Sequence, residues 1–405
     1  MTDASTAIHG FCAPGFSEVR SEFERNFLER DELGAAVAIC VDGTPVVDLW
    51  AGLADADTRR PWDRDTVAVV FSTSKGVAGL CLHILADGGA LDFNAPVARY
   101  WPEFAVNGKA GVTVEMVMSH QAGLPFWMDT LPPGALHDWD LVTGLLGKAT
   151  PLWEPGTCHG YHAMTLGNLE GELVRRITGQ TIGQFLQAHV AAPLAADVWF
   201  GLPEAEEPRV ATIYLPEPNP SSPLTRKLME EPDWVGHKMM NAGGDVTPEV
   251  INSRARHAAE IPAAGAITNA RSLARLYAPL SGDGSVDGVR LVSPGALPGM
   301  RTCRSASSRD LVLRIPTAFT LGFSKTWGDR RLGPGEHVIL GEQAFGTPGF
   351  GGSLGFADGE AGMSFGYVMN RLGGGVGLND RCQSLIDAAY RARGFHLSAA
   401  GPWVR

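Results

Sequence analysis

Two apolar runs near the start of the chain restrict its fold more than any other feature. Residues 35–41 and 46–50 are each long enough for a strand, and Asp42-Gly43 lies between them. An Asp-Gly pair suits the tight turn that joins two antiparallel strands. The sequence therefore predicts a β-hairpin here, preceded by a helix over residues 15–30, where four apolar side chains recur at helical spacing.

Strand patterns return only towards the other end of the chain. They follow about residue 290 and are clearest over 319–327 and 363–369, ahead of a closing helix over about 380–392. The long stretch between the two ends is mostly helical in pattern, with Gly and Pro as punctuation. We therefore expect an α/β (α+β) fold in which an antiparallel sheet is flanked by helices and a helical domain is inserted.

This pattern divides the chain into two domains. Residues 1–72 together with 290–405 are predicted to form a discontinuous α/β domain, and residues 73–289 a mainly helical domain. Within the helical domain, residues 214–262 hold several prolines, mixed charges and few periodic signals. We interpret this stretch as a long excursion that forms a lid over a site.

Charge and composition exclude several classes of function. The 405 residues include 33 Lys and Arg against 44 Asp and Glu, a net charge of −11, and no basic cluster stands out. Nucleic acid and anionic membranes are therefore not expected partners. The chain shows no run of about 18 apolar residues and no signal-peptide pattern at its start, which predicts a cytoplasmic protein.

Neither the cysteines nor the histidines indicate a metal or cofactor. The six cysteines are scattered without paired spacing, so we expect them to be reduced. His159 and His162 are close in sequence, but no third ligand accompanies them at helical spacing. We therefore predict a protein without a metal ion or a cofactor.

The stretch Ser72-Thr73-Ser74-Lys75 lies where an extended segment meets a helix with one apolar face. A serine and a lysine three residues apart project from the same side of a helix. At the helix start, the Ser72 hydroxyl meets free backbone N–H groups and the positive end of the dipole. An alcohol needs an adjacent base to act as a nucleophile, and Lys75 becomes that base when burial lowers its pKa. A helix cap with a solvated lysine fits the same four residues.

A lysine base also predicts a pH dependence. Because Lys75 must be neutral to accept a proton, activity should rise with pH towards neutral and alkaline values. A rate maximum near pH 5 would contradict such a base.

Tyr161 is the second candidate for proton transfer. It follows a turn-rich segment, residues 153–160, and precedes a helix, so that its side chain can hang into a cleft. A phenol beside an ammonium group can shuttle protons because the positive charge favours the phenolate. A buried tyrosine with a satisfied hydroxyl is the alternative.

A glycine-rich stretch, residues 345–356, is the third candidate. Glycines this dense allow backbone N–H groups to approach a ligand closely. An edge strand here would offer one N–H to a developing oxyanion, with the N–H of Ser72 giving the other. A simple turn between two strands fits the same residues.

Taken together and in this order, these stretches resemble the serine β-lactamase-like superfamily, and within it the family VIII carboxylesterases. The resemblance covers nearly the whole chain. Besides the hairpin and Ser72-x-x-Lys75 it includes Ser119-His120-Gln121-Ala122-Gly123-Leu124-Pro125, Trp153-x-Pro155-Gly156-Thr157, Tyr161-His162 and the Gly349–Asp358 segment before a strand that ends in Asn370.

The resemblance implies a site in the cleft between an α/β domain and a helical domain. Ser72 would be the acylated nucleophile, Lys75 its base, and Tyr161 a partner in proton transfer to the leaving alkoxide and from the deacylating water. The backbone N–H groups of Ser72 and Phe350 would form the oxyanion hole. The residues then expected to bind substrate are Phe126, Trp127, His162, Thr347 and Gly349.

Two departures from the β-lactamase pattern bear on the substrate. β-Lactamases and DD-peptidases commonly have asparagine two residues after the tyrosine, where this chain has Ala163. Their third motif begins with the lysine of Lys-Thr-Gly, where this chain has Thr347-Pro348-Gly349. That lysine holds the carboxylate of a β-lactam or a peptide terminus. Because Thr347 is neutral, charge-assisted recognition is lost there and neutral esters are favoured.

A competing nucleophile motif lies in the glycine-rich stretch. Gly351-Gly352-Ser353-Leu354-Gly355 matches Gly-x-Ser-x-Gly, and Asp358 or Asp380 followed by His396 would complete a triad. The match lies too close to the C-terminus to leave room for the strands and helices that should follow such an elbow. We therefore expect Ser353 to be polar but not catalytic.

The sequence thus predicts a serine carboxylesterase that hydrolyses small, short-acyl esters through an acyl-enzyme on Ser72. The same machinery would also serve a β-lactamase, a D-amino-acid peptidase or an acyltransferase. A non-catalytic binding or assembly protein is the remaining alternative, and the joint presence of Ser72, Lys75 and Tyr161 disfavours it. The sequence leaves open the natural substrate and the oligomeric state, with a homodimer among the options.

Overall fold

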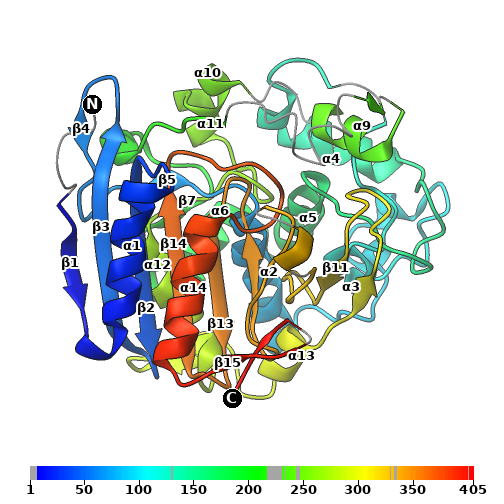
Figure 1. Cartoon of the computed structure of the whole chain (residues 1–405). Helices are drawn as coiled ribbons and strands as arrows, with labels where there is room; N and C mark the ends of the chain where they lie inside the picture. Colours follow the sequence, from blue (N-terminus) through cyan, green and yellow to red (C-terminus); the bar gives the residue numbers. More distant parts are fainter. Residues whose placement is uncertain are drawn as a thin grey trace.

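An antiparallel sheet of seven strands forms the centre of the α/β part of the molecule (Figure 1). The computed structural model describes residues 7–128, 131–216, 230–231, 233–242, 247–328, 330–332, 335–399 and 401–405. Within this part, the strand order is β1-β3-β2-β14-β13-β12, with β4 paired to β3. The strands are β1 (His9–Cys12), β2 (Gly34–Val41), β3 (Thr44–Asp55), β4 (Arg60–Pro61), β12 (Phe345–Pro348), β13 (Leu354–Asp358) and β14 (Met363–Met369).

The predicted hairpin is confirmed, and it joins the two ends of the chain. β2 and β3 meet at Asp42 and Gly43, whose φ values of 48° and 78° are the left-handed backbone that a type I′ turn requires. β14 pairs with β2 from Met369 opposite Ala35 to Met363 opposite Val41. The sheet is therefore discontinuous in sequence, as the positions of the strand patterns predict.

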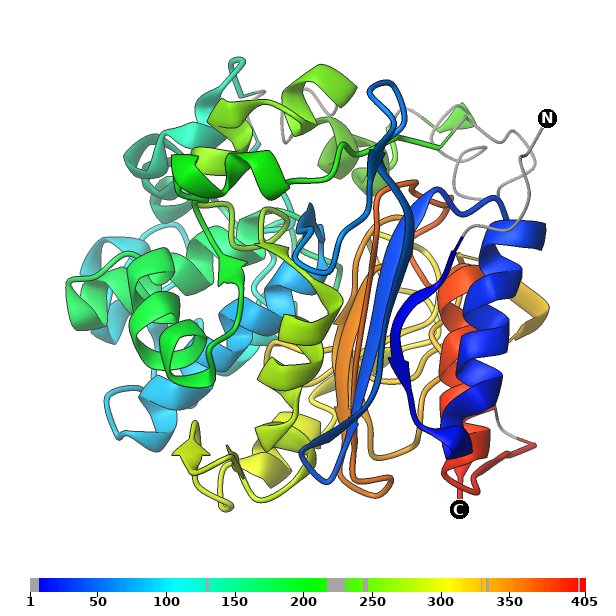
Figure 2. The same ribbon diagram turned by 90° about the vertical axis from the view of Figure 1, so that its left-hand side faces the viewer.

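Helices cover both faces of the sheet, as Figure 2 shows. α1 (Ser17–Glu29) and α14 (Asp380–Ala392) pack together on one face, and the bounds of α14 confirm the predicted closing helix. α12 (Ala270–Tyr277) lies on the other face, against β2, β13 and β14. α12 belongs to residues 73–289, the stretch predicted to form the helical domain, and yet it packs on the sheet.

Two glycines explain why α12 lies so close to the sheet. A Cβ atom on Gly366 would come within 2.2 Å of the Ala270 carbonyl oxygen, and one on Gly355 within 2.5 Å of the Tyr277 ring. Glycine on these strands therefore permits a contact that a side chain would block. The division into residues 1–72 with 290–405 and residues 73–289 stays a prediction.

A buried helix, α2 (Thr73–Asp87), organises the other half of the molecule. Its residues from Thr73 to His83 are all buried, so it is a core helix with no solvated face in its first three turns. It packs against α5 (Thr165–Thr178) and α6 (Ile182–Leu186). Further elements of this half are α3 (Val114–Met118), α4 (Trp139–Lys148), α7 (Ala192–Leu194), β5 (Ala68–Val69), β6 (Val198–Trp199) and β7 (Ile267–Thr268).

The strand predicted over residues 319–327 is mostly wrong. Only β11 (Thr317–Phe319) forms there, paired with β10 (Ser305–Ser307), and isolated bridges follow at Ser324 and Trp327. Gly322 has φ +84° and interrupts the extended backbone. The remaining elements are α13 (Leu297–Arg301), β8 (Ser285–Val286), β9 (Val289–Arg290), β15 (His396–Leu397) and β16 (Trp403–Val404).

The stretch interpreted as a lid, residues 214–262, is described only in part. Residues 217–229, 232 and 243–246 lie outside the described residues. The described helices of this stretch are α9 (Val235–Ala242), α10 (Pro248–Ile251) and α11 (Arg254–Ala258), at the top of the view in Figure 1. Whether this stretch acts as a lid stays a prediction.

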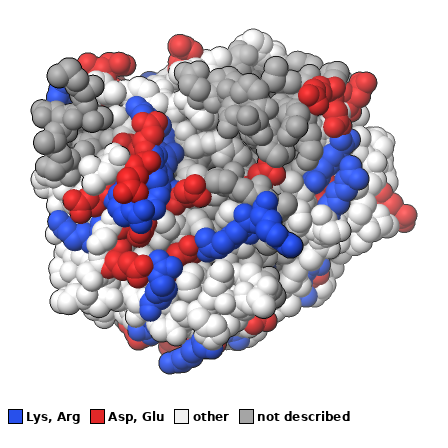
Figure 3. All heavy atoms as spheres, viewed as in Figure 1, with Lys and Arg blue, Asp and Glu red and all other residues white. Residues whose placement is uncertain are grey.

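Charged side chains of both signs lie interleaved on the face that carries α1 and α14 (Figure 3). Ion pairs account for part of this arrangement, including Arg25 with Glu22 and Arg391 with Glu18. Such exposed pairs each contribute little to stability. Among the helices of the described residues, none is both long enough and apolar enough to cross a membrane.

Candidate active site

Ser72 lies at the first turn of α2, directly after a strained residue. Phe71 has φ +45°, a left-handed conformation that bulky residues rarely adopt. Backbone hydrogen bonds from Thr73 to Val70 (3.2 Å) and from Ser74 to Phe71 (2.9 Å) fix this turn. Phe71 and Thr73 are buried while Ser72 stays partly exposed. Strain of this kind is found at functional sites, where it presents one side chain to a ligand.

Lys75 places a buried amine beside this serine. Its Nζ lies 3.0 Å from Ser72 Oγ, 2.6 Å from the Ala163 carbonyl oxygen and 2.9 Å from the Ala263 carbonyl oxygen. Burial lowers the pKa of Lys75 to about 7, and the negative charge of Glu170 opposes this shift. The two carbonyls can only accept, so they take the two N–H groups of a neutral amine. Its lone pair is then left for the Ser72 hydroxyl.

Tyr161 donates a hydrogen bond from its hydroxyl group to Ser72 Oγ. The Tyr161 Oη–Ser72 Oγ distance is 2.8 Å, and Lys75 Nζ lies 4.9 Å from the centre of the Tyr161 ring. Burial raises the pKa of Tyr161 above its ordinary value, so the phenol is neutral. Burial therefore opposes the phenolate that the sequence-based expectation places beside Lys75, and proton transfer by Tyr161 stays a prediction.

A buried carboxylate, Asp310, holds the Tyr161 backbone. Asp310 Oδ1 accepts the N–H of Tyr161 at 3.1 Å and those of Val312 and Leu313 at 2.8 Å each. Oδ2 lies 3.6 Å from His159 Nε2. Sequence reasoning missed Asp310. Its bonds to the residues two and three positions on are a local turn signal, but nothing in the sequence connects it to Tyr161.

His162 holds neighbouring backbone segments in place by hydrogen bonds, and it does not line the cavity beside Ser72. Its Nδ1–H donates to the Gly160 carbonyl oxygen at 2.7 Å, and its Nε2 accepts the N–H of Leu124 at 2.9 Å. Burial lowers the pKa of His162 to about 3, so the ring is neutral. The His162 N–H in turn donates to His120 Nδ1 at 3.0 Å. The motif that contains His120 and the motif that contains His162 are thereby held together. In the described part of the chain, no cluster of side chains fits a metal ion.

Two backbone N–H groups near Ser72 have no acceptor. Among the described residues, neither the N–H of Ser72 nor that of Phe350 donates a hydrogen bond. Phe350 follows β12, and its ring contacts Phe71 edge to face at 5.9 Å between centroids. Free N–H groups at this position fit an oxyanion hole. Gly349 is required beside them, since a Cβ there would come within 2.3 Å of the Val70 carbonyl oxygen.

Ser353 of the competing motif is buried in a different kind of environment. Its Oγ donates to the Val70 carbonyl oxygen at 2.8 Å and lies 3.1 Å from Thr73 Oγ1. His396 and Asp358 are not among its hydrogen-bond partners. The hydroxyl therefore ties the glycine-rich turn to the turn that carries Ser72.

Ser72 opens into a cavity of about 490 Å³. Tyr161, Thr347 and Phe350 also line it, so the structure brings these predicted residues together. Most of the wall is apolar. The lining further includes Phe71, Ala163, Met164, Leu215, Pro216, Met239, Val250, Ile251, Ala264, Leu313, Phe319, Trp327, Pro348 and Val376, with His237, Arg256, Thr317 and Ser324 as the polar members.

Several residues expected to bind substrate lie elsewhere. Phe126 and Trp127 are buried and do not line the cavity. The reason for Trp127 is that its indole N–H needs an acceptor and finds the Val142 carbonyl oxygen at 3.0 Å. Gly349 and His162 do not line the cavity either, although both contact residues of the site. Of the five expected substrate-binding residues, Thr347 alone lines the cavity.

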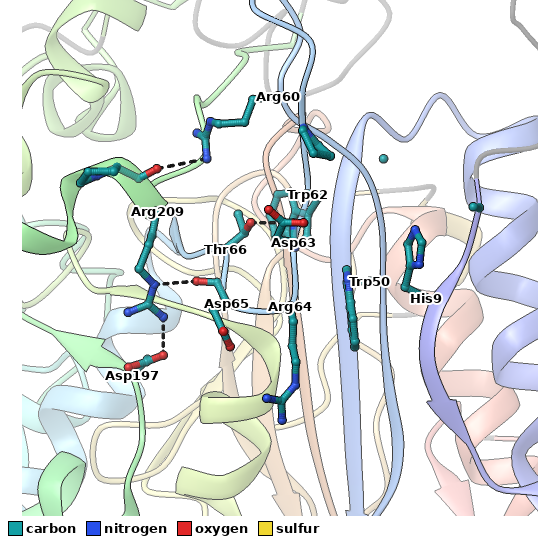
Figure 4. Close-up of a pocket in the computed structure, with 14 residues that line it drawn as sticks. His9, Trp50, Arg60, Trp62, Asp63, Arg64, Asp65, Thr66, Asp197 and Arg209 are labelled. Atoms are coloured by element: carbon teal, nitrogen blue, oxygen red, sulfur yellow. Dashed lines mark hydrogen bonds and ion pairs between the residues drawn. The ribbon is translucent and has the colours of Figure 1, made fainter.

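The larger cavity of the described structure is not this site (Figure 4). It measures about 1140 Å³ and is lined by residues of the β3–β4 region, with Trp50 beside His9. Arg209 reaches across it to Asp197 at 2.5 Å and to the Asp65 carbonyl oxygen at 2.9 Å. None of the candidate catalytic residues lines it, so its size does not mark the place of the chemistry.

Glu170 on α5 is a buried carboxyl group that the sequence did not single out. Neither of its oxygen atoms has a hydrogen-bond partner among the described residues, and its Oε1 lies beside Gly322. Burial raises the pKa of Glu170 well above its ordinary value, and the positive charge of Lys75 opposes this rise. Glu170 and Lys75 therefore influence each other's charge. In the sequence it is one polar residue of a predicted helix, with no sign of burial.

Comparisons with known proteins show the family of the chain. A family model described as Beta-lactamase matches residues 21–388. The chain is 36% identical over 377 residues to the esterase/beta-lactamase LipL of Mycobacterium tuberculosis, covering 91% of this chain and 84% of that protein.

Two crystal structures are similar along almost their whole length. One is a family VIII carboxylesterase, with a TM-score of 0.84 and 37% identity over 95% of this chain and 100% of the other. The second is a penicillin-binding protein homolog from Caulobacter crescentus, with a TM-score of 0.83 and 36% identity over 96% of this chain and 100% of the other.

Proposed function

The chain belongs to the β-lactamase family and is a serine hydrolase, and from that premise we propose that it is a carboxylesterase acting on small, short-acyl esters. One observation carries the proposal. Ser72 Oγ lies between a buried amine, Lys75 Nζ at 3.0 Å, and a neutral phenol, Tyr161 Oη at 2.8 Å. This arrangement activates an alcohol for attack on a carbonyl carbon.

In the proposed acylation, neutral Lys75 accepts the Ser72 proton as Oγ attacks the ester. The free N–H groups of Ser72 and Phe350 then stabilise the negative charge on the former carbonyl oxygen. When the C–O bond to the alcohol breaks, Tyr161 gives its proton to the leaving alkoxide and regains one from the Lys75 ammonium. The alcohol departs, and both side chains return to their neutral forms.

Deacylation follows the same path in reverse, with water in place of the alcohol. Lys75 and Tyr161 take a proton from the water as it attacks the acyl carbon, and the proton ends on Ser72 Oγ as the acid leaves. Because Lys75 must be neutral, and burial lowers its pKa to about 7, we expect activity to rise with pH through this value. A rate maximum near pH 5 would contradict the assignment.

The β12 side of the cavity supports an ester substrate over a β-lactam whose carboxylate is held at that strand. Thr347 is neutral at the place where the resemblance would put a lysine, and most of the lining is apolar. The name of LipL pairs esterase with β-lactamase, so β-lactam hydrolysis by the same acyl-enzyme is the second candidate. A D-amino-acid peptidase or an acyltransferase would use the same Ser72 chemistry.

Parallel kinetics on two substrates test the proposal. We expect the wild type to hydrolyse p-nitrophenyl butyrate with a higher kcat/KM than a chromogenic cephalosporin. Ser72→Ala should reduce both to background, a loss of about 10⁴-fold or more. A cephalosporin turnover far above that of the ester would make the chain a β-lactamase. Full activity in Ser72→Ala would place the nucleophile elsewhere, and no activity in either protein would favour a binding role.

A further inference from the structure

Arg256 is a cation in the wall of the Ser72 cavity with no partner. It lies on α11 and lines the cavity. Its backbone N–H donates to Ser253 Oγ at 3.2 Å, but in the described residues its guanidinium makes no hydrogen bond or ion pair. An arginine side chain carries five N–H donors and no acceptor. None of these five donors has a partner in the part of the chain that the structure describes.

The surroundings of Arg256 make this unpaired charge costly. The side chain is half-buried, and burial lowers its pKa to about 10 without any carboxylate opposing the shift. The group is still a cation at neutral pH. Burial lowers the pKa of the nearby His137, and the positive charge of Arg256 lowers it further. A partly buried cation without a counter-charge is unfavourable, so an anion that enters the cavity gains the interaction that the protein leaves open.

Other residues of α11 do find hydrogen-bond acceptors nearby. Arg254 donates to Glu207 at 3.2 Å and to the Leu202 carbonyl oxygen at 2.7 Å. His257 pairs with the same Glu207 at 2.7 Å. Arg256, between them, is directed to the cavity instead. Its lack of a partner is therefore a property of its position in the cavity wall.

We propose that Arg256 is a carboxylate-binding subsite and that the preferred substrates are esters bearing a carboxylate remote from the scissile bond. The inference rests on the proposed function, because it requires the cavity beside Ser72 to be the substrate site. A guanidinium binds a carboxylate through two parallel N–H···O bonds, and an apolar cavity strengthens that contact. The cation is supplied by α11, whereas Thr347 leaves β12 neutral.

Two pairs of matched esters test the subsite. The first pair carries the charge on the alcohol side: 4-acetoxybenzoate against its neutral amide, 4-acetoxybenzamide. The second carries it on the acyl side: monophenyl adipate against the corresponding adipamide ester. We expect the wild type to prefer the carboxylate in one of the pairs, and that pair identifies the end of the substrate that reaches Arg256.

Three variants separate recognition from structure. In Arg256→Gln, kcat/KM for the preferred carboxylate ester should fall about 10- to 100-fold, the range for a hydrogen bond to a charged group, while its neutral partner changes less than about twofold. Arg256→Lys should keep part of the preference. Arg254→Gln removes the same charge from the same helix outside the cavity, and should leave the preference unchanged.

An unchanged preference in Arg256→Gln, or an equal loss for both esters of a pair, would overturn the subsite. A wild type that prefers neither carboxylate would do so as well. If no ester is hydrolysed at all, the proposed function fails, and binding then tests the subsite separately. Calorimetry with benzoate and adipate should show weaker binding to Ser72→Ala/Arg256→Gln than to Ser72→Ala, and equal affinity would contradict the proposal.

Discussion

Two serines lie in adjoining turns of this molecule, and each matches a nucleophile motif. Ser353 belongs to a Gly-x-Ser-x-Gly sequence and Ser72 to Ser-x-x-Lys. They are joined through Thr73, whose Oγ1 lies 3.1 Å from Ser353 Oγ. Ser72 faces an amine and a phenol, whereas Ser353 faces a carbonyl oxygen and a hydroxyl. A nearby proton acceptor with a suitable pKa, and not the local motif, is what distinguishes a nucleophile.

Exposure separates the same two residues. Ser72 is partly exposed and lines a cavity, while Ser353 is 1% exposed. A substrate therefore reaches one hydroxyl and not the other. Ser353 still contributes to the site, because its bond to the Val70 carbonyl oxygen ties the turn of Phe350 to the turn of Ser72.

Removing the phenol beside Ser72 should have the largest effect of the changes that test this contrast. Tyr161→Phe is expected to lower kcat on p-nitrophenyl butyrate about 10²- to 10⁴-fold, because the leaving alkoxide loses its proton donor. Tyr277→Phe is the matched control, since the Tyr277 hydroxyl is buried and has no hydrogen-bond partner among the described residues. Its kcat should stay within about twofold of the wild type. Equal losses in the two variants would contradict a specific role for Tyr161.

Removing the second serine should affect stability more than catalysis. Ser353→Ala is expected to lower the free energy of unfolding by about 1–3 kcal/mol, because two buried polar partners lose a hydrogen bond. We expect kcat to fall less than about tenfold, since only the position of the Phe350 N–H is disturbed. Urea unfolding and ester kinetics measure the two effects. A folded variant without any activity would instead identify Ser353 as the nucleophile.

A smaller change concerns the base that distinguishes Ser72. In Glu170→Gln the acid limb of the kcat/KM profile should move to lower pH, by less than about one unit. Burial favours the protonated form of Glu170, so only its ionised fraction stabilises the Lys75 ammonium, and removing that fraction lets Lys75 become neutral at a slightly lower pH. Glu172→Gln is the control, because Glu172 pairs with Arg175 and Arg176. A shift to higher pH, or the same shift in both variants, would contradict this coupling.

The same substitution has a thermodynamic signature. Burial raises the pKa of Glu170 in the folded protein above the value of about 4.3 expected for an unfolded chain. Above that value the unfolded state has released a proton that the folded state retains, so stability falls as the pH rises towards the folded pKa. Glu170→Gln should remove this part of the pH dependence of unfolding.

Local patterns predicted those parts of the molecule that local chemistry determines. The Asp42-Gly43 hairpin turn and the helix over 380–392 follow from turn chemistry and from apolar spacing, and both are confirmed. Ser72 and Lys75 are three residues apart on one helix, so their contact is also local. Tyr161 lies far away in sequence and was joined to them through the family resemblance.

Long-range packing accounts for what the sequence did not predict. α12 lies on the sheet because Gly355 and Gly366 make room for it, and neither glycine is close to the helix in sequence. Asp310, Glu170 and Arg256 matter through what surrounds them in space, namely a backbone turn, a buried lysine and an apolar cavity. Trp127 is placed by the need of its indole N–H for an acceptor on α4.

Covalent labelling gives the most direct test of Ser72 as the nucleophile. The protein would be treated with a fluorophosphonate probe until p-nitrophenyl butyrate hydrolysis stops, and the adduct then located by intact-protein and peptide mass spectrometry. A single adduct on Ser72, formed in step with the loss of activity, is the predicted result. An adduct on Ser353, or complete labelling of Ser72 with activity retained, would contradict it.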